Sequence, residues 1–130
     1  MKQKINSAMV KHAKSLTKGL KMKINSLIEK AYHTAVSKGW HESTRAIPEL
    51  LCLMHSEISE ALEEYRNGKQ PTEIYYTEDG KPEGIPIELA DAVIRIADFC
   101  GLHDINLEEA LKIKLTYNES RSYRHGNKTC

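Results

Sequence analysis

The sequence predicts an all-α fold: a helical bundle of about four core helices behind a basic helical extension. Apolar residues recur at helical spacing in four separate segments, which is the main sequence signal for amphipathic helices. Prolines stand in two of the expected first turns, and glycine ends three of the segments. The connections between the segments are mostly short, and a bundle is the natural architecture for such a chain.

The N-terminal segment is basic and carries its own helical pattern. Residues 1–23 hold seven lysines and no carboxylate, and residues 1–20 place apolar side chains at helical spacing between those lysines. The formal net charge of +1 hides this asymmetry, since the rest of the chain has 12 basic against 18 acidic side chains. We therefore divide the chain into a basic extension at 1–22, a domain at 23–126 and a tail at 127–130.

The domain is expected to begin with two helices. The first covers about residues 25–38, with one apolar stripe, and Gly39 ends it. The second starts with Pro48 in its first turn and runs to Arg66, where an Asn-Gly pair gives a C-cap signal. Both helices therefore have a core-facing stripe and a defined end.

A break and two further helices follow. Residues 67–84 contain two prolines and three glycines around a strand-like run, so we expect a loop or a short hairpin. The third helix, about residues 86–101, is apolar on a wide arc, and we expect it to be largely buried. The fourth begins at Asn106, which forms a capping-box-like pair with Glu109, and continues to about Ser120.

Composition excludes several classes of protein. Hydrophobic residues make up 40% of the chain and fall in periodic runs, which excludes a disordered chain. No apolar stretch reaches the roughly 18–20 residues of a membrane span, so we expect no membrane partner. Three widely spaced cysteines, Cys52, Cys100 and Cys130, form neither a disulfide framework nor a CxxC metal motif. Free thiols favour a reducing, cytoplasmic location.

Carboxylates stand at matching offsets on two of the expected helices. The second helix carries Glu57, Glu60 and Glu64 on one face, and the third carries Glu88 and Asp91 one turn apart. These acids lie within apolar sequence, and burying several carboxylates together is costly unless a cation compensates them. Oxygen-only ligands suit Mg²⁺, with Mn²⁺ as a substitute. The alternative is that the acids form a solvated helix face.

Arg95 lies on the Glu88 face of the third helix. The simplest interpretation of that spacing is an ion pair between Arg95 and Glu88 alone.

The acid pattern resembles the ExxE…ExxD signature of the MazG-like, all-α nucleoside triphosphate pyrophosphohydrolases. Glu57-x-x-Glu60 is followed after 27 residues by Glu88-x-x-Asp91. The resemblance extends to the segments 55–64 and 81–98, and to a C-terminal run that reads Lys-x-x-Tyr-Asn-x-x-Arg-x-x-Arg-His-Gly. It covers about residues 24–126.

The resemblance implies hydrolysis of a deoxy- or ribonucleoside triphosphate to the monophosphate and pyrophosphate. It makes Glu57, Glu60, Glu88 and Asp91 the Mg²⁺ ligands, and it implies a homodimer or homotetramer with sites between helices of neighbouring subunits. It places Trp40 against the base. The positions that it assigns to the phosphates or sugar are Lys114, Asn118 and Arg121, with Arg124 close behind.

A catalytic base needs a carboxylate beyond the metal ligands. Glu64 shares the face of Glu57 and Glu60 and is the candidate, so these three residues form the expected catalytic set.

Two alternatives stay open at this point. A phosphoribosyl-ATP pyrophosphohydrolase shares the helical acid arrangement. A catalytically silent helical oligomer would instead use the basic extension to bind nucleic acid, and a steep dependence of that binding on salt would identify it. We favour the enzyme and do not expect nucleic acid as a partner, because the extension lies outside the resemblance.

Overall fold

The computed structural model describes residues 11, 15, 21–127 and 129. Most of the basic extension, with its expected helix, lies outside the described residues. The regular elements of the described part are helices and one short hairpin, so the all-α prediction is confirmed. Its elements are α2 (Ile24–Ser37), α3 (Ile47–Arg66), β1 (Tyr75–Tyr76), β2 (Pro82–Glu83), α4 (Ile85–Leu102), α5 (Leu107–Glu119) and α6 (Arg124–Asn127).

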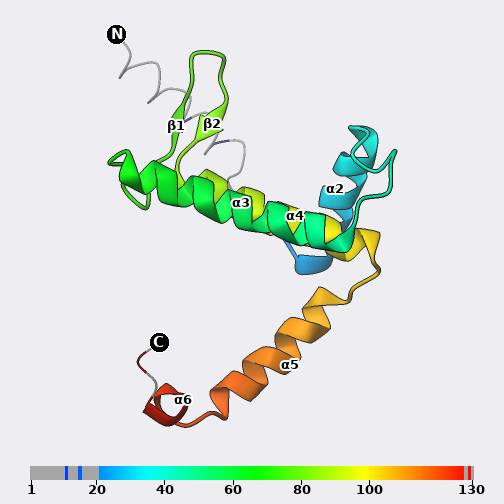
Figure 1. The fold of residues 1–130 in the computed structure, drawn as a ribbon, viewed down its shortest axis with the longest axis vertical. Helices are drawn as coiled ribbons and strands as arrows, with labels where there is room; N and C mark the ends of the chain where they lie inside the picture. The colour runs from blue at the N-terminus through cyan, green and yellow to red at the C-terminus, as the bar shows by residue number, and fades with distance from the viewer. Residues whose placement is uncertain (1–10, 12–14, 16–20, 128, 130) are drawn as a thin grey trace.

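The packed centre of the chain consists of three helices. α3 and α4 lie side by side in opposite directions, with the hairpin at one end of the pair, and α2 packs against α4 near its other end (Figure 1). α5 leaves the end of α4, touches α2 and then runs away from the α3–α4 pair (Figure 1). The groove between α3 and α4 is therefore the natural place for side chains of two helices to meet.

Local sequence signals explain the helix boundaries. Pro48 stands in the first turn of α3, where its missing N–H is not needed. Gly68 follows the end of α3 with a φ of +83°, a conformation that glycine adopts without strain. The Asn106 side chain accepts a hydrogen bond of 3.1 Å from the backbone N–H of Glu109, so the predicted cap of α5 is confirmed.

The region 67–84 forms the short hairpin that the sequence allowed. β1 and β2 pair in antiparallel fashion, with Tyr75 opposite Glu83. Gly84, between β2 and α4, has a φ of +120°, and a Cβ there would lie 2.3 Å from the carbonyl oxygen of Glu73. Only glycine fits that approach, which fixes where α4 begins and therefore where Glu88 lies one turn later.

The interior is built from small side chains. The buried apolar residues of the described part are Ala31, Ala61, Ala92, Ala97 and Cys100. Small residues let helix axes approach closely: a Cβ at Gly101 would lie 2.7 Å from the Cβ of Tyr32 on α2. Close helix packing therefore replaces a core of large side chains.

The expectation that the third helix is largely buried is wrong for a single copy of the chain. Leu89, Val93, Ile94 and Ile96 on α4 are 37–49% exposed. α2 and α3 cover only part of the apolar arc, and no other described helix covers the rest. Among the described residues, no helix has the length and apolarity that crossing a membrane requires.

Candidate metal centre and adjoining cavity

Three carboxylates from α3 and α4 converge in the groove between these helices. One oxygen from each of Glu57, Glu88 and Asp91 lies within 4.8 Å of the others. Glu57 and Glu88 are only 6% and 5% exposed. Because Mg²⁺ holds oxygen at ~2.1 Å, opposite ligands of one ion are ~4.2 Å apart, and small side-chain rotations would bring this set to one ion. An oxygen-only, acidic donor set fits Mg²⁺ or Mn²⁺.

The electrostatics of this triad favour added positive charge. Burial, followed by a hydrogen bond with Glu60, raises the pKa of Glu88 from 4.5 to about 7. Burial and the neighbouring Glu57 raise the pKa of Asp91, while Arg95 and Lys81 oppose that rise. A cation bound between these carboxylates would remove the repulsion that makes their ionised forms costly.

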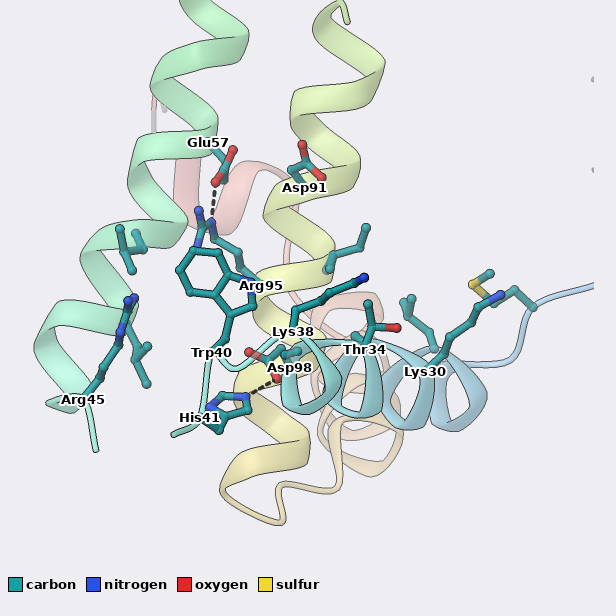
Figure 2. Close-up of a pocket in the computed structure, with 17 residues that line it drawn as sticks. Lys30, Thr34, Lys38, Trp40, His41, Arg45, Glu57, Asp91, Arg95 and Asp98 are labelled. Carbon is teal, nitrogen blue, oxygen red and sulfur yellow. Dashed lines mark hydrogen bonds and ion pairs between the residues drawn. The ribbon is translucent and has the colours of Figure 1, made fainter. Parts of the chain in front are cut away.

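Arg95 pairs with Glu57 rather than with Glu88, so the simple same-helix interpretation of Arg95 is wrong. Its Nε donates a hydrogen bond to Glu57 Oε1 across the α3–α4 groove (Figure 2). The Glu57 side chain is 7% exposed and that of Arg95 is 42% exposed. A half-exposed cation is therefore bonded to an almost fully buried member of the triad.

Glu60 and Glu64, the two other predicted acids of α3, lie outside this close triad. Glu60 is next to Glu88 through their hydrogen bond. Glu64 accepts hydrogen bonds from the Tyr75 hydroxyl at 3.0 and 3.1 Å. Burial and Glu64 together raise the pKa of Tyr75 to about 12, so this hydroxyl keeps its proton. The ligand role of Glu60 and the base role of Glu64 stay predictions.

A cavity of about 540 Å³ adjoins the triad, and Glu57 and Asp91 form part of its wall (Figure 2). Its volume is typical of pockets for small organic ligands. Trp40 lines it from the α2–α3 connection, and Leu53 and Ile94 add apolar surface. The contact of Trp40 with a base stays a prediction.

Four cationic side chains also line the cavity: Lys30, Lys38, Arg45 and Arg95. Lys30 and Thr34 lie one turn apart on one face of α2, and Lys38 is the residue that directly follows the end of this helix. The Arg45 guanidinium carbon lies 5.3 Å from the centroid of the Trp40 ring, within reach of a cation–π contact. The cavity thus combines an aromatic platform with positive charge beside an acidic cluster.

A histidine–aspartate pair supports the cavity near Trp40. His41 Nε2 lies 2.8 Å from Asp98 Oδ1, and both residues line the cavity (Figure 2). The ring of Tyr32 stacks on His41, with centroids 5.6 Å apart and planes 29° apart. This pair joins the α2–α3 connection to α4 and so fixes the segment that carries Trp40.

The predicted phosphate and sugar residues at the C-terminal end do not line this cavity within one chain. Lys114 and Arg121 gather instead around Tyr117 on α5, at 4.9 and 5.6 Å from its ring centroid. Asn118 belongs to the same helix. Arg124 lies over Tyr123 at 5.5 Å, with a φ of +48°. Their role in binding substrate stays a prediction.

The sequence held a signal for the residues that motif reasoning missed. Glu88, Asp91, Arg95 and Asp98 follow one another at intervals of three, four and three, which places one polar stripe along an otherwise apolar helix. The stripe would have marked Arg95 and Asp98 as members of the site. Lys30 and Lys38 had the same kind of signal, because they stand eight residues apart with Thr34 midway.

No protein-family model, no curated protein and no solved structure matches the chain. Inference about function therefore starts from the chemistry of the triad and the cavity.

Proposed function

We propose that the chain is a Mg²⁺-dependent nucleoside triphosphate pyrophosphohydrolase of the MazG-like type, with Mn²⁺ as a substitute ion. The reaction converts a ribo- or deoxynucleoside triphosphate to the monophosphate and pyrophosphate. One observation carries the proposal: a carboxylate triad of Mg²⁺-compatible chemistry, with Glu57 and Glu88 buried, adjoins a cavity that is lined by Trp40 and by cations. An acidic helix face in solvent would have neither the burial nor the cavity.

Different residues of the site are proposed to bind the metal, the base and the phosphates of the nucleotide. Glu57, Glu88 and Asp91, with Glu60 beside them, would hold the metal, and a bound metal would supply charge neutralisation for the phosphates and activation of a water. Trp40 offers its face to the base. Lysine and arginine side chains of the cavity stabilise the negative charge that phosphoryl transfer spreads over the phosphate oxygens.

Assembly is part of the proposal. Apolar side chains on the outer faces of α3, α4 and α5 are exposed in one copy, among them Leu62, Val93 and Ile113. Exposed apolar surface of this kind is characteristic of oligomer interfaces. In a homodimer or homotetramer, α5 of a second copy, with the residues that directly follow it, brings Lys114, Asn118 and Arg121 to the cavity of the first.

A substrate panel tests the activity directly. The purified protein is incubated with each ribo- and deoxynucleoside triphosphate, and with phosphoribosyl-ATP, in Mg²⁺ and then in Mn²⁺. Pyrophosphate and inorganic phosphate are scored separately, and we expect pyrophosphate with the matching monophosphate. Release of inorganic phosphate alone, or no release from any substrate by folded protein, contradicts the proposal. Preference for phosphoribosyl-ATP would identify the chain as a phosphoribosyl-ATP pyrophosphohydrolase instead.

A further inference from the structure

We infer that Arg95 couples divalent-cation binding to polyphosphate binding, by competing for Glu57 in the free protein and pairing with the substrate's phosphates in the loaded one. The inference rests on the proposed function, since it concerns the binding of the metal ion and the phosphates to the same site. It assigns Arg95 a positioning role that neither the acid motif nor the C-terminal motif contains.

The first step of the argument is the shared carboxylate. Arg95 Nε donates to Glu57 Oε1, and Glu57 belongs to the triad whose oxygens lie within 4.8 Å of one another. The charge of Arg95 also opposes the rise in the pKa of Asp91 that burial and Glu57 cause. The guanidinium is therefore the counter-ion of two of the three carboxylates that would hold a metal.

The second step is charge repulsion. Two cations within a few ångströms repel each other strongly in a buried groove, where the effective dielectric constant is well below that of water. Arg95 therefore opposes the binding of a divalent cation to the triad when nothing else is bound. Conversely, a cation bound by the triad weakens the ion pair between Glu57 and Arg95.

The third step concerns the new partner of Arg95 once its ion pair with Glu57 is broken. Its side chain is 42% exposed and lines the cavity, so it moves without disturbing the helix packing (Figure 2). A guanidinium has five N–H donors that match phosphate oxygens, and a polyphosphate in the cavity offers a new partner. Binding of the polyphosphate then relieves the competition, and by linkage each ligand strengthens the other.

The test measures binding without turnover. Mn²⁺ affinity is determined by titration at pH 8, alone and with saturating inorganic pyrophosphate, for the wild-type protein and for Arg95→Met. We expect Mn²⁺ alone to bind about tenfold more tightly to Arg95→Met than to the wild type, a coupling of ordinary size. Pyrophosphate should tighten Mn²⁺ binding to the wild type and should do so much less in Arg95→Met.

Arg45→Met is the matched control, because Arg45 lines the same cavity but contacts Trp40 and not the triad. It removes the same charge and should leave the affinity for Mn²⁺ alone within about twofold, as expected of a residue that shares no carboxylate with the ion. Should Arg95→Met fail to fold, Arg95→Gln repeats the measurement with a neutral polar side chain.

The outcomes separate this inference from the proposed function. Weaker or unchanged binding of Mn²⁺ to the Arg95 variants overturns the coupling role, while the metal site itself stands if the wild type binds Mn²⁺ and Glu57→Gln does not. Absence of Mn²⁺ binding to the wild type overturns both. Tighter binding to the Arg95 variants in a protein that cleaves no nucleotide supports the coupling and rejects the hydrolase.

Discussion

The hydroxyl of Tyr75 donates to both carboxylate oxygens of Glu64, at 3.0 and 3.1 Å. Tyr75 lies in β1 of the hairpin and Glu64 in the last turns of α3, so this contact fastens the hairpin to the helix that carries Glu57. The same hairpin ends at Gly84, where α4 and its acids begin.

Tyr75→Phe should destabilise the fold modestly by removing this donor. We expect a loss of about 1 kcal/mol in the free energy of unfolding, the usual worth of one hydrogen bond. Urea unfolding followed by circular dichroism measures it. Tyr76→Phe is the control, because Tyr76 has no hydroxyl contact of this kind with Glu64 among the described residues. Equal stability of Tyr75→Phe and the wild type would show that the contact does not hold the hairpin.

Glu57→Gln and Asp91→Asn should each abolish metal-dependent turnover while leaving the helical content intact. Each substitution removes a negative charge from the proposed metal-binding triad, and we expect a loss of at least ~100-fold in activity. Mn²⁺ titration and pyrophosphate release are measured on the same samples.

Glu63→Gln is the matched control, since Glu63 lies on the same helix but is exposed and pairs with Arg66 at 3.4 Å. Near-normal activity in both triad variants would remove these residues from the metal site.

The stability of the metal-free protein should fall as pH rises. Glu88 has a pKa of about 7 in the folded protein against 4.5 ordinarily, so its protonated form favours folding. That contribution is complete below pH 4.5 and is lost as pH rises through 7. Thermal unfolding in EDTA between pH 5 and 8 should therefore show a falling Tm.

Glu88→Gln should show a flatter pH profile and a higher Tm than the wild type at pH 8, by at least a few degrees for a domain of this size. Mg²⁺ should raise the wild-type Tm at pH 8 and leave Glu88→Gln unchanged. A difference between the two proteins that does not vary with pH would contradict the assignment.

Gly101→Ala should be destabilising, although alanine is the better helix former. Helix propensity alone predicts a gain of ~1 kcal/mol. The added Cβ would lie 2.7 Å from the Cβ of Tyr32, which forces α2 and α4 apart. Overpacking of this kind costs about 1–3 kcal/mol, so we expect a net loss in the free energy of unfolding. A stabilised variant would mean that the two helices separate freely.

Association in solution should depend on the apolar face of α5. The Ile113 side chain is well exposed in one copy, and we expect Ile113→Glu to shift the protein from dimer or tetramer toward monomer. Light scattering coupled to size-exclusion chromatography measures the mass. Lys112→Glu makes a larger charge change at the neighbouring, exposed position and should leave the mass unchanged. A monomeric wild type would contradict the proposed assembly.

The features of the site that follow from periodicity within one helix could be predicted from the sequence. The spacing of Glu57, Glu88 and Asp91 places each acid on a helix face, and the pairing of α3 with α4 brings those faces together. The partner of Arg95 was out of reach because it depends on the register between two helices, which no spacing within one helix encodes. The exposure of α4 was missed for a related reason: periodicity gives the width of an apolar arc but not the number of neighbours that cover it.

The small-residue interior has a consequence for how the protein behaves on dilution. A chain that buries alanine and cysteine in its described interior, while Leu62 and Val93 stay exposed, gains comparatively little from folding alone. In the proposed dimer or tetramer, exposed apolar side chains such as these leave water when a second chain binds. Folding and assembly then form one equilibrium governed by mass action, and the unfolding midpoint should rise with protein concentration.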